Sequence, residues 1–546
     1  MASRPGISWR LCALGLLLAG RSAFAGEAVL PIPPPQELEA RGAIIGEVHI
    51  VVGDVFDTSI EGEDGWLYRT ANKLHINTRP SVIRGQLLFR TGDPYRHRLV
   101  LETERILRAA GYLYDAVIVP VAFDGTTVDL EVRTRDVWTL NPGISFSRKG
   151  GENAFGAQIQ EDNLLGTGRE LDFSWDSNVD RESYGVSYRD PHFWHSFTRF
   201  GVSYQDADDG STKLLQLDRP FYALDVRRAG GVYLLDTERN DSRYVLGDEI
   251  GEFQHRDEYY EAYVGISAGL QDRWARRWTA GVAYERDRFE LDPVEPPGGP
   301  LPQDRTLAYP WVGFELVEDG FEERINQDQI LRTEDVLVGL RASLRIGYSS
   351  EAFGADRDAI IVSATLEDGT DLRPGMSLFG DLLASGRIED GELVNGRLTA
   401  DARYYWATSS RSKFFAAVAG TVTEQLDDEY QLTLGGDNGL RGYPLRYQAG
   451  TSRALLTLEQ RYYTKWYPFR LFHVGAAAFI DVGRTWGTDV TGAGSLGLLR
   501  DVGIGLRLGS SRSSFGNVLH VDLAFPLDGD DDIDSVQLLV TTRRSF

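Results

Sequence analysis

The sequence predicts a mostly β protein, a transmembrane antiparallel β-barrel that follows one small α+β domain. Beyond residue 136, short segments of alternating apolar and polar residues replace any helical periodicity. The chain then ends on an aromatic residue, Phe546, directly after such a segment. A terminal strand without a trailing tail is expected to pair and close a sheet. The third observation is an export signal at the N-terminus.

Residues 1–25 are predicted to be a secretory signal peptide. Arg4 and Arg10 give a positively charged start, an apolar stretch covers residues 11–19, and a small-x-small cleavage site ends at Ala25. The apolar stretch is too short to span a bilayer as a helix. The mature protein is therefore expected to be exported.

Composition narrows the classes of function. The only cysteine, Cys12, lies inside the predicted signal peptide, so neither disulfides nor Cys-based metal sites are expected in the mature chain. The formal charge is −24, and cleavage would remove arginines but no acidic residue. So acidic a chain is a poor candidate for nucleic-acid binding, which needs a basic surface.

The region before the barrel is predicted to hold a leader and one small domain. Residues 26–43 are proline-rich and are expected to form an extended leader outside any core. Residues 44–135 show the mixed pattern of a self-sufficient α+β unit. The expected elements are a strand at 47–52, helices at 67–76, 81–89 and between Asp93-Pro94 and Gly111, and strands at 114–123 and 127–133 joined by an Asp124-Gly125 hairpin turn.

From residue 136 to 546, the alternation indicates strands with an apolar outer face and a polar lumen. In residues 501–508, one face carries Val, Ile, Leu and Leu, and the other carries Asp, Gly, Gly and Arg. This pattern is typical of a membrane barrel with a wet interior. The alternation predicts about 20 candidate strands, some of them expected to be hairpins within loops. Clear cases lie at 143–146, 171–175, 184–188, 336–348, 454–462, 472–480, 502–508 and 519–525.

A glycine-rich loop at 434–450 is the strongest candidate for a functional element, the alternative being an ordinary exposed hairpin loop. It presents one arginine, Arg441. Alternation along the next two strands places the carboxylates of Glu459 and Asp481 in the lumen. A guanidinium can pair bidentately with a carboxylate. We therefore predict that Arg441 folds into the lumen and pins the loop through Asp481, with Glu459 as a secondary partner.

Several motifs, in matching order, resemble those of the bacterial outer-membrane assembly and translocation superfamily typified by BamA, TamA and the two-partner secretion transporters. The resemblance covers about residues 44–546. The motifs are Leu440-Arg441-Gly442-Tyr443, the strand motif of Phe479, Asp481 and Gly483, the turn at 161–168, Asp190-Pro191-His192-Phe193, and the glycine and aromatic positions of a POTRA domain at 92–95 and 111–112.

The resemblance implies a barrel of about 16 strands behind a periplasmic POTRA domain. It implies that unfolded client proteins pair with an exposed POTRA edge by β-augmentation, and that a seam between 143–146 and 536–546 admits a strand or opens toward lipid. The implied partners are outer-membrane lipid and lipopolysaccharide, clients in the periplasm and a periplasmic or lipoprotein partner. Neither nucleic acid, a cofactor, a metal nor enzymatic activity is implied.

Two features depart from the superfamily pattern. Only one POTRA domain is recognisable, which argues against the central, essential assembly factor. The last strand carries Thr542 and Arg544, where a more apolar or aromatic face is usual.

Three other patterns have simpler explanations. The G-x-S-x-G pattern at 265–269 lacks the helix that a nucleophile elbow needs. His192 and His195 are expected in a polar turn near an aromatic girdle instead of a metal site. The acidic segment 528–534 is expected to be a solvated outer loop, with a divalent ion as the alternative.

The sequence therefore favours an outer-membrane protein that assists assembly, insertion or translocation of proteins. Two alternatives stay open. One is a passive pore for small solutes, with the N-terminal unit as a plug or tether. The other is a transporter dedicated to a single secreted exoprotein.

Overall fold

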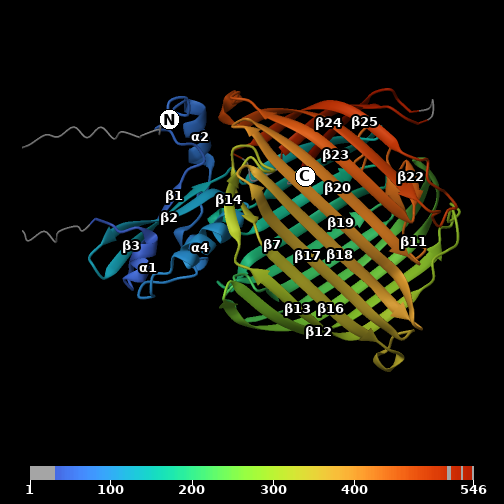
Figure 1. The fold of residues 1–546 in the computed structure, drawn as a ribbon, viewed down its shortest axis with the longest axis horizontal. Helices are drawn as coiled ribbons and strands as arrows, with labels where there is room; N and C mark the ends of the chain where they lie inside the picture. Colours follow the sequence, from blue (N-terminus) through green and yellow to red (C-terminus); the bar gives the residue numbers. More distant parts are fainter. Residues whose placement is uncertain (1–30, 513–517, 530–532, 544–546) are drawn as a thin grey trace, which may run out of the picture.

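A computed structural model shows a wide barrel with a small domain lying across one of its ends (Figure 1). The structure describes residues 31–512, 518–529 and 533–543. The predicted signal peptide and the terminal Phe546 lie outside these residues. No helix in the described ranges is long and apolar enough to cross a membrane.

The N-terminal domain is a three-stranded sheet in the order β1-β3-β2, with β3 parallel to β1 and antiparallel to β2. Its helices bury Ile83 and Leu107 against Leu113 and Leu130 of the sheet. The elements are α1 (Pro35–Ala40), β1 (Ile44–Gly53), α2 (Trp66–Leu74), α3 (Pro80–Gly85), α4 (His97–Ala109), β2 (Leu113–Phe123) and β3 (Thr127–Asp136).

The expectation of an extended leader is wrong for residues 35–40, which form α1. Proline at the first helical position is compatible with a helix, because the N–H it lacks would have no intrahelical partner there. Leu38 of α1 is fully buried in the core of the domain. The segment therefore belongs to the domain.

The barrel wall is a closed antiparallel sheet of 20 strands, so the expected number of about 16 is wrong. Each alternating segment from β5 to β13 forms its own wall strand instead of a hairpin within a loop. The wall consists of β4 (Leu140–Lys149), β5 (Glu152–Glu161), β6 (Glu170–Ser177), β7 (Glu182–Phe193), β8 (Thr198–Ala207), β9 (Gly210–Arg219), β10 (Arg228–Val245), β11 (Asp248–Gln271), β12 (Trp274–Leu291), β13 (Arg305–Glu318), β16 (Leu340–Ser349), β17 (Ala359–Arg373), β18 (Met376–Glu389), β19 (Glu392–Ser409), β20 (Ser412–Glu424), β23 (Ser452–Tyr463), β24 (Phe472–Trp486), β25 (Leu499–Ser510), β26 (Val518–Pro526) and β27 (Gln537–Arg543).

One hairpin leaves the wall at the end nearest the N-terminal domain. It consists of β14 (Phe321–Ile325) and β15 (Thr333–Leu337), which pair with each other. Its tip reaches the lumen, where Tyr405 donates a hydrogen bond of 2.8 Å to Asp328. Residues 336–348 are therefore not one strand, as the alternation suggested, because Val336 belongs to this hairpin and β16 begins at Leu340.

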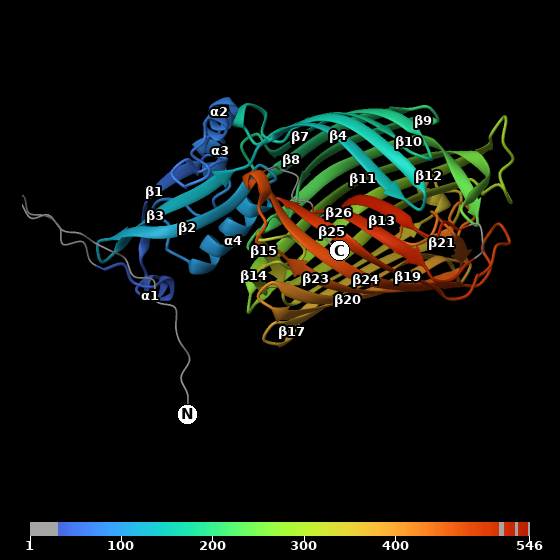
Figure 2. The ribbon, with the colours of Figure 1, turned by 90° about the horizontal axis from the view of Figure 1, so that it is seen from above.

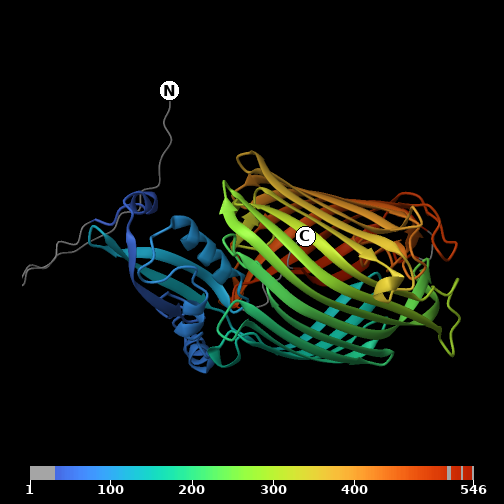
Figure 3. The same cartoon turned by 90° about the horizontal axis from the view of Figure 1, so that it is seen from below.

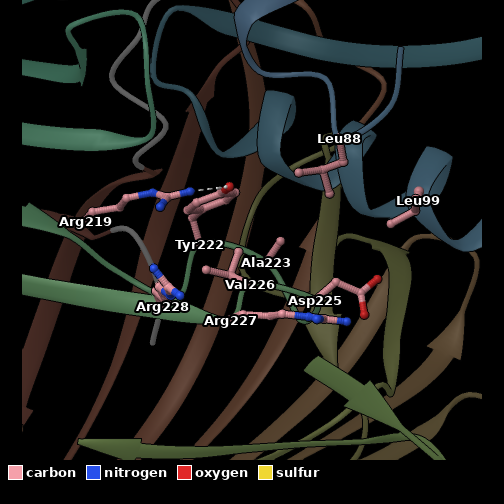
Figure 4. Close-up of a pocket in the computed structure, with 9 residues that line it drawn as sticks. All are labelled: Leu88, Leu99, Arg219, Tyr222, Ala223, Asp225, Val226, Arg227 and Arg228. Carbon is pink, nitrogen blue, oxygen red and sulfur yellow. Dashed lines mark hydrogen bonds between the residues drawn. The ribbon is translucent and has the colours of Figure 1, made fainter. Parts of the chain in front are cut away.

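The N-terminal domain docks on this hairpin and on the turn between β9 and β10. Figures 2 and 3 show the domain at the barrel end where the hairpin lies. Arg108 of α4 donates two hydrogen bonds to Asp335 of β15, at 2.8 and 2.5 Å. Glu102 of α4 accepts a hydrogen bond of 2.8 Å from the backbone N–H of Leu224. A cleft lies beside this second contact (Figure 4). Leu88 and Leu99 form the part of its lining that belongs to the N-terminal domain.

The first and last strands close the wall at the seam between β4 and β27. Among the described residues, Val540 opposite Arg148 is the one register pair that joins them. By contrast, β26 and β27 pair at every position from Val518 opposite Arg543 to Ala524 opposite Gln537. Within the part of the chain that the structure describes, the seam is therefore paired over a shorter length than the neighbouring wall.

Candidate functional site

The loop between β20 and β23 starts at the barrel end opposite the N-terminal domain (Figure 1). A short ladder of β21 (Leu432–Leu434) and β22 (Gln448–Gly450) forms its base. Its central segment turns inward, so that Leu440 and Tyr443 are fully buried. Gly442 is required at this point, because a Cβ there would lie 2.7 Å from Cβ of Asp501.

Arg441 lies at the centre of the lumen side of this loop. Its guanidinium forms a bidentate pair with Asp481 of β24, from Nε to Oδ2 at 2.6 Å and from Nη2 to Oδ1 at 3.0 Å. Nη1 also donates to Glu459 of β23 and to Asp522 of β26, both at 3.2 Å. Arg441 is 3% exposed and Asp481 is 0% exposed. A buried pair of this geometry is strong because water does not compete for the hydrogen bonds.

Two further arginines complete the network around these carboxylates. Arg461 of β23 and Arg507 of β25 both pair with Glu459, at 3.0 and 3.1 Å, and Arg507 also contacts Asp522. Three guanidinium groups therefore share three carboxylates, Glu459, Asp481 and Asp522, all buried. Their mutual pairing offsets part of the cost of taking the charges out of water.

The strand motif of β24 shapes the place that the loop occupies. The ring of Phe479 lies under the guanidinium of Arg441, with Cζ 3.3 Å from the ring centroid. Cations over aromatic faces are stabilised by the ring quadrupole. Gly483 leaves room for the loop, because a Cβ there would lie 3.1 Å from the side chain of Leu440.

The neighbours of Arg441 fix the loop to β25 through a side chain and through its backbone. The N–H of Gly442 donates to Oδ2 of Asp501 at 3.0 Å. The hydroxyl of Tyr443 donates to the carbonyl oxygen of Arg500 at 2.8 Å and accepts from the N–H of the same residue at 3.1 Å. The four residues from Leu440 to Tyr443 therefore act together as one attachment.

The same network reaches the hairpin at the other end of the barrel. Arg461 pairs with Glu459 and donates from Nη1 to the carbonyl oxygen of Gln327, at the tip between β14 and β15, at 3.2 Å. The hydroxyl of Tyr463 donates to the carbonyl oxygen of Asn326 at 3.4 Å. Loop and hairpin thus enter the lumen from opposite ends and meet at one set of charges.

Comparison with known proteins gives a family match to the same part of the chain. Residues 370–540 match the model of the Omp85 superfamily domain. The chain carries an Omp85 superfamily domain. The resemblance seen in the sequence is thereby confirmed for this region, and the barrel is an outer-membrane β-barrel.

The Omp85 domain contains Arg441 and all three of its carboxylate partners. Similar solved structures are BamA from Haemophilus ducreyi lacking POTRA domains 1-3 (13% identity, 91% of this chain and 84% of that chain, TM-score 0.38), CdiB from Acinetobacter baumannii (11%, 92% and 73%, 0.45) and CdiB from Escherichia coli (14%, 91% and 75%, 0.47). These TM-scores are below 0.5, so the assignment rests on the family match.

Some members of the charged network around Arg441 were not predicted from the sequence. Asp522 was not singled out, although alternation in the segment 519–525 places it on the lumen face. The contact from the hairpin at Gln327 had no signal in the sequence, because a loop that folds into a lumen alternates no differently from one that does not.

The remaining candidates stay apart from this network. Ser267 lies within β11, and its hydroxyl donates to the carbonyl oxygen of Arg276 at 2.8 Å. His192 lies edge-on to the ring of Phe197 at 5.6 Å. Among the described residues, no group of three or more His, Cys, Asp or Glu side chains could hold a metal ion.

Proposed function

We propose that the protein assists the assembly, insertion or translocation of other proteins at the outer membrane, without a bond-making step. The observation that carries this proposal is the buried attachment of Arg441 to Asp481. An outer loop held inside the lumen by three carboxylates occupies part of the path that small solutes would use. The match of residues 370–540 to the Omp85 superfamily domain supports the same class of function.

In this function the wall, and not the lumen, is the place where clients are handled. Over the residues that the structure describes, β4 and β27 share one register pair, so an incoming strand could extend the strand edges beside it. The Arg441 network lies on β23 to β26, directly beside β27. We infer that the Arg441 network holds strands β23 to β26 and the lumen loop in place while the seam changes its pairing.

The N-terminal domain is assigned the role of a POTRA-like receiver for clients. Its two edge strands differ in how open they are to an added strand. On β2, the N–H of Ile118 already donates a hydrogen bond of 2.5 Å to the carboxylate of Glu104, and Pro120 has no N–H to donate. We therefore place client pairing on β1, along the part that includes the exposed Val51.

A passive pore is the alternative from another class, and conductance separates the two. Reconstituted in planar bilayers, the wild-type protein is expected to show small and intermittent conductance, because the loop and the hairpin both occupy the lumen. Deletion of residues 319–339, which contain the β14–β15 hairpin, should raise the conductance. A large and steady conductance of the wild-type protein would instead support the passive pore. A transporter for one exoprotein would be favoured by a large exported adhesin in the neighbouring reading frame.

A further inference from the structure

We propose that helix α2 is an interfacial helix, which inserts its apolar face into the phospholipids of the periplasmic leaflet beneath the barrel seam. This inference depends on the outer-membrane barrel and not on the proposed handling of clients.

The faces of α2 are chemically distinct. None of its residues is buried, yet Trp66, Leu67 and Leu74 lie along one stripe at helical spacing and are 74%, 59% and 70% exposed. The opposite face holds Tyr68, whose ring packs on Phe56 at 4.8 Å. The helix is thus anchored on one side, and its apolar stripe is left uncovered by the described part of the chain.

The helix is held under the seam by contacts on both sides of it. On one side, the hydroxyl of Tyr68 donates to the carbonyl oxygen of Phe469, in the turn between β23 and β24, at 3.2 Å. On the other side, the hydroxyl of Thr78, shortly after the helix, accepts a hydrogen bond of 2.8 Å from the side-chain amide of Asn163, in the turn between β5 and β6. In ring order, β4 and β27 lie between these two turns.

The position also places α2 at the periphery of the molecule. Figures 1 and 2 both show it at the outer edge of the N-terminal domain, beside the rim of the barrel wall. The adjoining turn exposes two further aromatic side chains, Trp466 at 66% and Phe469 at 77%. Exposed aromatics at the rim of a membrane barrel mark the level of the lipid headgroups. The turn that Tyr68 of α2 contacts therefore carries aromatic side chains at the level expected for lipid headgroups, next to the helix.

The charges on α2 agree with a phospholipid surface. Arg69 and Lys73 are exposed and lie to one side of the apolar stripe. A helix with Trp and Leu on one face and cations beside it lies in the interface plane, with its apolar face about 5–10 Å into the headgroup and acyl boundary. Phosphate groups of the leaflet would pair with the cations, so the expected occupant is lipid and not an apolar protein surface.

Spin labels on the full-length mature protein test this proposal. Single cysteines are introduced by L67C and L74C, with V117C on β2 as an exposed control within the same domain. The labelled proteins are reconstituted in vesicles of phosphatidylethanolamine and phosphatidylglycerol. Collisions of each label with oxygen, which concentrates in lipid, and with a water-soluble nickel complex are then measured by electron paramagnetic resonance.

Labels at 67 and 74 are expected to collide mostly with oxygen, and the label at 117 mostly with the nickel complex. A label introduced by K73C should lie between these limits, at the depth of the headgroups. Equal nickel accessibility at positions 67, 74 and 117 would overturn the proposal and leave a protein partner as the occupant. Heat-modifiable migration in gels confirms for each variant that the barrel is folded.

Discussion

Replacing Arg441 by alanine is expected to release the loop from the lumen and to lower the stability of the barrel. Asp481, Glu459 and Asp522 would lose a shared partner while staying buried. Breaking a buried ion pair by removing one partner costs about 3–5 kcal/mol of unfolding free energy. R441K should recover only part of this loss, because an ammonium group cannot form the bidentate pair.

Urea unfolding in detergent measures the stability, and proteinase K digestion of residues 434–450 measures release of the loop. The matched control is R500A. Arg500 forms an equally bidentate pair with Asp528, at 2.9 and 2.7 Å, but its side chain is 52% exposed. Removing such an exposed pair changes stability by about 0–1 kcal/mol. A loop in R441A as resistant to protease as in the wild type would show that Arg441 does not pin it.

Closing the seam with a disulfide is expected to abolish function while the fold stays intact. Val540 and Arg148 are directly opposite each other. The Cα atoms of such a pair are close enough for a disulfide to join the two positions. The variant R148C/V540C should lose the delivery of proteins to the outer membrane under oxidising conditions and regain it on reduction. Its activity is read from the abundance of outer-membrane and secreted proteins in cells that carry only the variant.

The control staple lies on the far side of the wall. Ala280 of β12 and Val312 of β13 are also directly opposite each other, and A280C/V312C should leave delivery unchanged. If the oxidised seam variant supports delivery as well as this control, clients do not pass through the seam.

Much of the fold follows from the period of two along the strands. It separates the lumen face from the lipid face of β24, where Asp481 is 0% exposed and the next residue toward the N-terminus, Ile480, is 44% exposed. Strand number does not follow from the resemblance to a family, because insertions of whole hairpins preserve the motifs at either end. The short helix around Leu38 was missed because consecutive prolines usually indicate an extended chain.

The site could be predicted only as far as local patterns reach. The glycines of the loop, Arg441 and two inward carboxylates are visible in the sequence, since each depends on neighbours within one or two strands. Asp522 lies 81 positions from Arg441, and the tip of the hairpin at Gln327 contacts Arg461 across 134 positions. Contacts of this range depend on closure of the barrel, which brings distant strands around one lumen.

Site-specific photocrosslinking tests most directly whether this barrel handles other proteins at its seam. A photoreactive amino acid is placed at Leu538, an exposed position on β27, and at Val51 on β1, with Val282 on β12 as a lipid-facing control on the opposite wall. Illumination of cells during synthesis of outer-membrane proteins should give adducts with newly made chains at 538 and 51, and none at 282. Equal labelling at 538 and 282, or no protein adduct at either, would contradict the account.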